Sequence, residues 1–283
     1  MVSPGADRLP GGEAAWYAAL ESLIEDAAAL NTPGRLVTGL EHLVSFELAT
    51  MFVYRGRSRP LHIYDDFRTS EEKRGIANYI ESTYVLNPLY LALQKGLPDG
   101  VYRIRDLAPD AFFQSEVYRS HRILPRRSEE IGYLTRDWPE GMEEADLVVT
   151  LEAGVTGELS IYRSLAAGGL RDRELARLAA VVPVARALLR RFWTCYSRSQ
   201  IRVPPPDDRV DLAFAAFGRE VLSEREREVV QLILRGHSSE SIGANLGISL
   251  GTVKTHRKNA YAKLGISSQS ELLSRFLQSL QAQ

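Results

Sequence analysis

The sequence contains a single cysteine, Cys195, among its 283 residues. One cysteine cannot form an intrachain disulfide, and one thiol cannot by itself supply the ligands of a metal cluster. This excludes the disulfide-rich secreted class and fits a reducing compartment. We therefore expect a cytoplasmic protein.

Long hydrophobic runs are also missing. The most apolar stretch, residues 179–189, is interrupted by Pro183 and Arg186 and is far shorter than the roughly 20 apolar residues that a membrane helix needs. The first thirty residues carry acidic side chains instead of a basic start followed by an apolar core. We expect no membrane partner.

Motifs for catalysis are scarce. The five histidines show no metal-ligand spacing. The sequence has no phosphate-binding glycine loop of the Walker type and no nucleophile-elbow pentapeptide. We expect no catalytic residues, no metal site and no cofactor, and we predict that the protein is not an enzyme.

Charge is distributed unevenly along the chain. Residues 218–283 carry nine basic and six acidic side chains, whereas the preceding 217 residues carry 26 basic and 30 acidic ones. A short basic segment attached to a longer acidic one indicates nucleic-acid contact at the C-terminal end.

Three consecutive prolines at 204–206 mark a domain boundary, because such a run cannot continue a helix and favours an extended spacer. We predict a loose tail at 1–12, a regulatory α+β domain at 13–201, a Pro-rich linker at 202–217 and an all-α helix-turn-helix domain at 218–283. Strands are expected at 47–54, 61–64, 146–151 and 157–162, and helices at 13–30, 33–45, 70–84, from 88 to about 94, and at 170–196. This order favours an antiparallel sheet with flanking helices.

The C-terminal segment has the signals of four short helices. Ser223 with Glu226, and Ser268 with Glu271, have the spacing of capping boxes, and glycines stand where helices end. The third helix is expected at 249–264 and contains four basic residues and no acidic one. At about 100° per residue, one of its sides is small and basic and the opposite side is mostly apolar. A basic helix that packs by its apolar side can enter the roughly 12 Å wide major groove of DNA. The basic side consists of Gly251, Lys254, Thr255, Lys258 and Ala262.

This segment closely resembles the C-terminal helix-turn-helix domain of LuxR-type transcriptional regulators. One position departs from the family: Gly243 stands where alanine is usual, and we expect it to weaken the second helix by less than about 1 kcal/mol. The resemblance rests on Leu222, Ser223, Arg225, Glu226, Glu228, Val229, Val230, Gly236, Ile242, Leu246, Ile248, Ser249, Thr252, Val253, Lys254, His256, Lys263, Leu264 and Gly265.

The resemblance implies double-stranded DNA as the partner and a homodimer as the binding form. Lys254, Thr255 and Lys258 match positions that face the major groove. Phosphate contacts are expected from Thr252, Arg257 and Tyr261 and from the start of the helix at Ser249 and Gly251. The fourth helix, 268–280, is expected to contribute to dimerisation through Leu273, Phe276, Leu277 and Leu280.

The N-terminal region resembles, more loosely, the PAS/GAF-like sensor domains of LuxR-type regulators, on the order of its elements. A small-molecule effector would be bound among aromatic side chains with a few polar groups. The candidates are Tyr54, Tyr64, Tyr84, Tyr90 and Trp138. A basic run from Arg119 to Arg127 could bind an anion or lie as a solvated loop.

Two other classes of protein stay open at this point. A sigma-like subunit of RNA polymerase would share the four-helix plan of the C-terminal domain, and would need core polymerase to bind DNA. If the protein were an enzyme with a DNA-binding tail, residues 1–200 would have to turn over a substrate by themselves. RNA polymerase also remains a candidate partner of a regulator.

Overall fold

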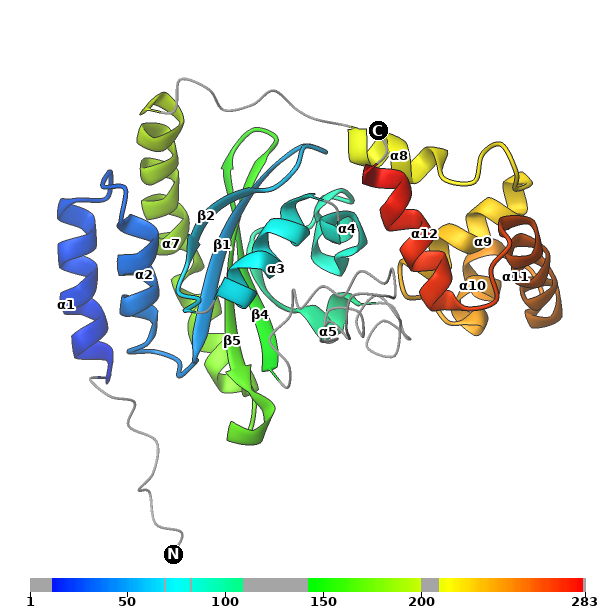
Figure 1. The fold of residues 1–283 in the computed structure, drawn as a ribbon. Helices are drawn as coiled ribbons and strands as arrows, with labels where there is room; N and C mark the ends of the chain where they lie inside the picture. The colour runs from blue at the N-terminus through cyan, green and yellow to red at the C-terminus, as the bar shows by residue number, and fades with distance from the viewer. Residues whose placement is uncertain (1–11, 69, 82, 109–141, 200–208, 282–283) are drawn as a thin grey trace, which may run out of the picture. The chain divides into compact units, whose positions relative to one another are not determined.

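The computed structural model describes residues 12–68, 70–81, 83–108, 142–199 and 209–281 (Figure 1). They form two compact units. The first unit comprises the described residues within 12–68, 97–103 and 142–199. The second comprises those within 70–96, 104–108 and 209–281. The structure confirms an α+β chain with an antiparallel sheet in its N-terminal part and a helical C-terminal region.

The first unit is built on a five-stranded antiparallel sheet with the order β2-β1-β5-β4-β3. Its strands are β1 (Leu48–Arg55), β2 (Leu61–Asp65), β3 (Gly100–Arg103), β4 (Met142–Glu152) and β5 (Val155–Ser164). The sequence predicted four of them and missed β3. This strand has only four residues, too few for a clear alternation of polar and apolar side chains.

Helices cover one face of this sheet (Figure 1). They are α1 (Gly12–Glu25), α2 (Thr32–Leu40) and the 28-residue α7 (Asp172–Ser199), which continues through Pro183. Leu147, Val149 and Ile161 on the sheet and Leu178 and Leu189 on α7 belong to the same buried core. A short 3-10 helix, η3 (Leu165–Ala167), follows β5.

The other face of the sheet has a different character, because successive side chains of a strand point to opposite sides. On β4 and β5 the residues between the core positions include Glu144, Asp146, Glu158 and Ser160, followed by Tyr162, with the apolar Val148 opposite Glu158. All of these residues are buried. The same two strands therefore place an apolar surface on one side and a polar, acidic one on the other.

The second unit contains two groups of helices. The first group comprises α3 (Ser70–Glu81), the 3-10 helix η1 (Thr83–Leu86), α4 (Pro88–Leu93) and α5 (Ile104–Leu107). The helix predicted at 70–84 therefore ends earlier, and η1 follows it. Asn87 begins α4 by accepting a hydrogen bond from the Leu89 amide, and its side-chain nitrogen donates to the Tyr79 hydroxyl over 3.1 Å.

The second group holds five helices where four were predicted. They are α8 (Arg209–Ala216), α9 (Glu224–Leu234), α10 (Ser239–Leu246), α11 (Leu250–Leu264) and α12 (Gln269–Gln281). Helix α8 lies within the predicted linker, of which residues 202–208 are outside the described ranges. The Phe276 ring on α12 contacts Phe214 on α8 and the following Phe217 edge-to-face, with ring centroids 5.2 and 5.4 Å apart. Residues 209–217 thus help to form the core of the C-terminal helices.

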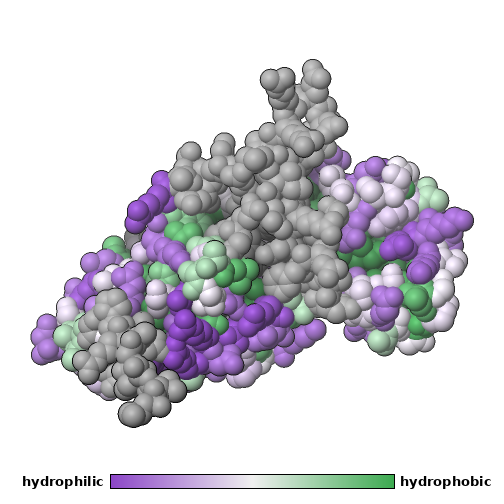
Figure 2. Space-filling view, turned by 90° about the horizontal axis from the view of Figure 1, so that it is seen from below, coloured by the Kyte–Doolittle hydropathy of each residue, from purple (hydrophilic) through white to green (hydrophobic). Residues whose placement is uncertain are grey.

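In the described ranges, no helix combines the length and the apolar composition needed to cross a membrane. Among the residues coloured in Figure 2, hydrophilic side chains are more widespread than apolar ones. Large exposed apolar side chains include Tyr17 and Ile24 on α1 and Leu212 on α8.

The contact of α8 with α12 predicts that Phe214→Ala destabilises the C-terminal helices. Removing a buried phenyl ring leaves a cavity, which lowers the free energy of unfolding by about 3–5 kcal/mol. Hydrogen exchange of the α12 amides in the full chain measures this loss. Leu212→Ala is the matched control, because Leu212 on the same helix is 64% exposed and its truncation should change stability by less than about 0.5 kcal/mol. Equal acceleration of exchange in both variants would contradict a structural role for α8.

Candidate nucleic-acid interface and buried carboxyl cluster

Local capping determines where α11 begins and ends. The Ser249 hydroxyl accepts a hydrogen bond from the Thr252 amide over 3.1 Å at its N-terminus. The preceding helix, α10, ends at Gly247, which has a φ of 64° and therefore a backbone conformation that glycine adopts readily. The serine caps of α9 and α10, Ser223 and Ser238, have the same geometry. The predicted capping box of Ser223 and Glu226 is confirmed.

Helix α11 has one buried and one exposed side. Val253, Ala260 and Leu264 are buried, and the helix contacts α9 and α10. The structure places the predicted DNA-contacting residues on the remaining surface: Ser249, Gly251, Thr252, Lys254, Thr255, Arg257 and Lys258 are exposed, and Tyr261 is half-buried. Seven of the eight candidates are thus open to solvent in this unit.

The charge of α11 is available to a partner. Of its four basic residues, Lys263 is engaged by Glu226, whose carboxylate lies 2.7 Å from the Lys263 Nζ. This hydrogen bond holds the pKa of Glu226 below its ordinary value. Among the described residues, Lys254, Arg257 and Lys258 have no acidic partner within ion-pair distance. Three positive charges therefore remain exposed on one helix.

A hollow of about 360 Å³ lies beside this basic surface. Lys254, Arg257 and Lys258 line it together with Tyr261 and with the residues that precede and begin α12, Ser267, Ser268 and Gln269. Cationic side chains, hydroxyl groups and the N-terminus of a helix are all suited to bind a phosphate group. The hollow can therefore accept the backbone of a nucleic acid.

The packing of α10 gives Gly243 a role that helix propensity alone does not reveal. A Cβ atom at this position would lie 2.9 Å from the backbone oxygen of Ile248. The Gly243 carbonyl also accepts a hydrogen bond from the Ile248 amide over 3.0 Å. The glycine lets the turn between α10 and α11 fold back closely on α10.

The dimerisation residues predicted on α12 need a correction. Leu273, Phe276 and Leu277 are at most 5% exposed and pack inside their own unit. The side chain of Leu280 is not among those described. The dimerisation role was inferred from the family resemblance, whereas in this chain α8 and Phe217 cover Phe276.

The aromatic candidates for ligand binding lie in different parts of the described structure. Tyr54 and Tyr64 belong to the first unit, and the register places Tyr64 opposite Met51, on the α2 side of the sheet, away from Tyr54. The Tyr64 ring lies against Gly34 of α2. Tyr84 and Tyr90 belong to the second unit and contact each other edge-to-face at 5.0 Å. Trp138 and the basic run 119–127 lie outside the described residues.

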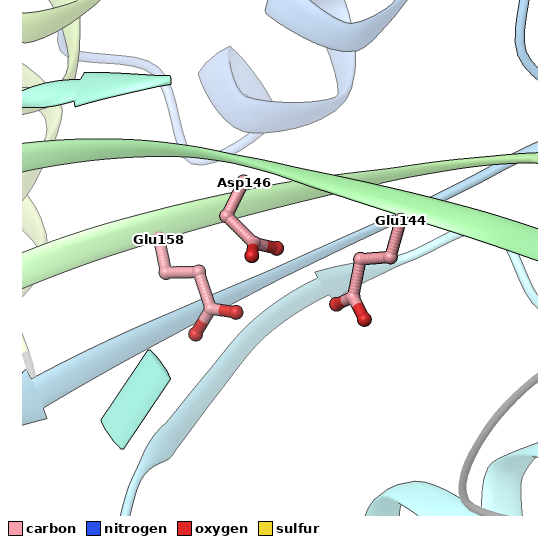
Figure 3. Close-up of side chains that lie close together, drawn as sticks. All are labelled: Glu144, Asp146 and Glu158. Atoms are coloured by element: carbon pink, nitrogen blue, oxygen red, sulfur yellow. The ribbon is translucent and has the colours of Figure 1, made fainter. Parts of the chain in front are cut away.

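A cluster of three buried carboxyl groups lies on the acidic face of the sheet (Figure 3). Glu144 and Asp146 extend from β4 and Glu158 from β5, and one carboxyl oxygen of each lies within 4.8 Å of the others. The Tyr162 hydroxyl donates to Glu144 and the Ser160 hydroxyl to Glu158, each over 3.0 Å. Both oxygens of Asp146 and the second oxygen of each glutamate have no hydrogen-bond partner among the described residues.

Burial makes these groups hard to ionise. It raises the pKa of Glu144 to about 8, with the charge of Glu158 adding to the effect, and it raises the pKa of Glu158 to about 7. The pKa of Asp146 also lies well above its ordinary value, because of burial first and then the neighbouring glutamates.

Sequence reasoning missed this cluster. The predicted strand began at Asp146, whereas β4 begins at Met142 and includes Glu144. The alternation of Glu144 and Asp146 was a usable signal, because residues two apart in a strand share a face. Nothing local indicated that Glu158 of the next strand lies beside them, which depends on the register of β4 with β5.

Comparison with known proteins identifies the C-terminal region. Residues 220–276 match the family described as "Bacterial regulatory proteins, luxR family". A putative HTH-type transcriptional regulator in the exeN 3′ region of Aeromonas salmonicida is 34% identical over 200 residues, which cover 69% of this chain and 94% of that protein. This match extends well beyond the helix-turn-helix segment.

The solved structures that match this chain are more distant in sequence. The VqsR LBD domain from Pseudomonas aeruginosa is 19% identical and covers 65% of this chain and 99% of that domain, with a TM-score of 0.48. SdiA in complex with octanoyl-rac-glycerol is 18% identical over 93% of both chains, with a TM-score of 0.40. Scores below 0.5 do not establish a common fold.

The close approach at Gly243 predicts that Gly243→Ala destabilises the C-terminal helices. Higher helix propensity would add up to about 1 kcal/mol of stability, but crowding against the Ile248 carbonyl costs about 1–3 kcal/mol. We expect a net loss of about 1 kcal/mol in urea denaturation of the full chain. Gly251→Ala is the control, since its nearest neighbouring atom would be 3.7 Å away and the alanine should be tolerated. A more stable Gly243→Ala variant would contradict the packing argument.

Proposed function

The chain belongs to the luxR family of bacterial regulatory proteins, and we propose that it controls transcription by placing α11 in the major groove of promoter DNA. The observation that carries this proposal is the exposed basic side of α11, with Lys254, Arg257 and Lys258 unpaired among the described residues. A helix that packs by one side and presents cations on the other fits the groove.

The predicted contact residues of α11 fall into two groups in this proposal. Lys254, Thr255 and Lys258 contact base edges, since they share the side of the helix opposite the buried Val253 and Ala260. Phosphates are bound by Thr252, Arg257 and Tyr261 and by the start of the helix at Ser249 and Gly251. The hollow beside Arg257 and Ser268 supports a phosphate contact at the other end of α11.

We further propose that two copies bind together, because a two-fold dimer reads half-sites about one helical turn apart. Its contacts exclude the buried Leu273, Phe276 and Leu277.

We also propose that the regulator acts in the cytoplasm, where its DNA lies. RNA polymerase is its partner at the promoter. A small molecule bound by the N-terminal part controls DNA binding, and the buried carboxyl cluster supports such a role because unpaired polar groups in a core indicate a function other than packing.

The relative from A. salmonicida favours this proposal over the alternatives. It is named a transcriptional regulator and is aligned along 94% of its length, including sequence before the helix-turn-helix segment. A sigma-like polymerase subunit or an enzyme with a DNA-binding tail would predict relatives of those classes over the same region.

The proposed docking predicts that Lys258→Ala and Lys254→Ala each weaken specific operator binding by about 1–3 kcal/mol, because a base contact is lost. Fluorescence anisotropy with the operator identified by genome-wide footprinting measures the affinity. Lys95→Ala is the matched control, since Lys95 is an exposed lysine that follows α4.

Arg257→Ala tests the phosphate role separately. It should weaken binding to specific and nonspecific duplexes alike and reduce the slope of log affinity against log salt by about 1. Wild-type footprints in both lysine variants would refute the docking of α11.

A further inference from the structure

The carboxyl cluster of Glu144, Asp146 and Glu158 lacks a positive partner. Four of its six oxygens, including both of Asp146, have no hydrogen-bond partner among the described residues. Asp146 is completely buried and its carboxyl group points at those of the two glutamates (Figure 3). No arginine or lysine within the described part of the chain forms an ion pair with any of the three.

Such an arrangement is unfavourable unless something neutralises it. An unpaired buried charge is strongly destabilising, and native cores leave few polar atoms without partners. Two agents can remove the charge: protons taken up by the carboxyl groups, or a bound cation. A cation with N–H donors would in addition satisfy the unpaired oxygens, which protons shared among three carboxyl groups do only in part.

The surroundings of the cluster favour an organic cation over a metal ion. Calcium takes 6–8 oxygen ligands and magnesium requires six in a regular octahedron. The hydroxyl groups beside the carboxyl groups, Ser160 and Tyr162, are already engaged. The neighbours on this face include aromatic rings: Phe52 lies opposite Glu158 in the register of β1 with β5, and the Tyr162 ring lies 6.4 Å from Phe67, while Thr50 lies opposite Ser160 and Val148 opposite Glu158. Aromatic faces attract organic cations and do not ligate a metal.

We propose that the acidic face of the N-terminal sheet binds a small organic cation, with Asp146, Glu144 and Glu158 holding a protonated amine or guanidinium group and with Phe52 and Tyr162 beside its carbon chain. This inference rests on the proposed function, in which the N-terminal part receives the signal, and it assigns the chemical class of the effector. An ammonium group donates three hydrogen bonds and a guanidinium group five, which suits the four unpaired oxygens.

Binding should release protons. Because burial keeps the pKa of Glu144 and Glu158 near or above neutrality, part of the cluster is protonated at pH 7 without a cation. A bound cation favours the ionised form and lowers these pKa values. The other titratable groups on this face of the sheet are Tyr54, Tyr102, Tyr162 and, beyond Phe52, His62 with its partner Asp65.

The test is a titration of the full-length protein at pH 7 with putrescine and with agmatine. The neutral butane-1,4-diol, sodium chloride at equal ionic strength, and magnesium and calcium chloride serve as comparisons. We expect saturable binding of at least one amine by calorimetry, a rise in Tm, and proton release seen as a dependence of the heat on the buffer. The diol and sodium chloride should have no such effect.

Isosteric variants locate the site. Asp146→Asn and Glu144→Gln keep the shape of the side chains and remove a buried carboxyl group, so both should fold, and each should weaken amine binding at least about tenfold. Glu152→Gln is the matched control on the same strand, because Glu152 accepts a hydrogen bond from the Trp193 indole, which glutamine can also accept. Its amine affinity should equal that of the wild type.

Several results would overturn the inference: no binding of either amine, binding unchanged in both Asp146→Asn and Glu144→Gln, or stabilisation by magnesium or calcium alone. Operator binding of the same preparations, measured without amine, separates this inference from the proposed function. Normal operator binding without amine binding refutes only the cation site. If the protein binds amine but Lys254→Ala and Lys258→Ala keep the operator affinity of the wild type, only the docking of α11 is refuted.

Discussion

The packing of Val253, Ala260 and Leu264 against α9 and α10 is the contact on which the DNA-binding part of the molecule depends. It orients α11 so that its lysines and Arg257 face solvent, and the close turn at Gly243 brings α10 and α11 together. Apolar burial and exposed charge are thus two sides of one helix, as the groove of a duplex requires. Glu226 adds to this by capping α9 and binding Lys263 of α11.

The N-terminal sheet also has an apolar side and a charged side, formed here by the two faces of its strands. One face packs on α7 with apolar side chains, and the other places Glu144, Asp146 and Glu158 side by side. Buried carboxyl groups without partners reduce stability. Proteins keep such destabilising buried groups mainly at functional sites. Such a cluster is useful in a protein that responds to an effector. A ligand that pairs with the buried carboxyl groups also stabilises the conformation that binds it.

Local signals predicted the C-terminal helices well. Serine caps and terminal glycines act over three or four residues, so the ends of α9, α10 and α11 could be read directly from the sequence. The N-terminal strands were found where apolar and polar residues alternate, and the short β3 was missed. Residues 209–217 were taken as linker because of the prolines before them, yet Phe214 and Phe217 complete a core with Phe276. This contact also buries Phe276, one of the predicted dimerisation residues.

Residue types at short, regular spacing were enough to predict the family, the α+β class and the basic side of α11. Only the tertiary structure decided which apolar residues are covered, why position 243 is glycine, and that three carboxyl groups from two strands lie together. Those features depend on backbone approach and strand register, which bring together residues that no local pattern connects.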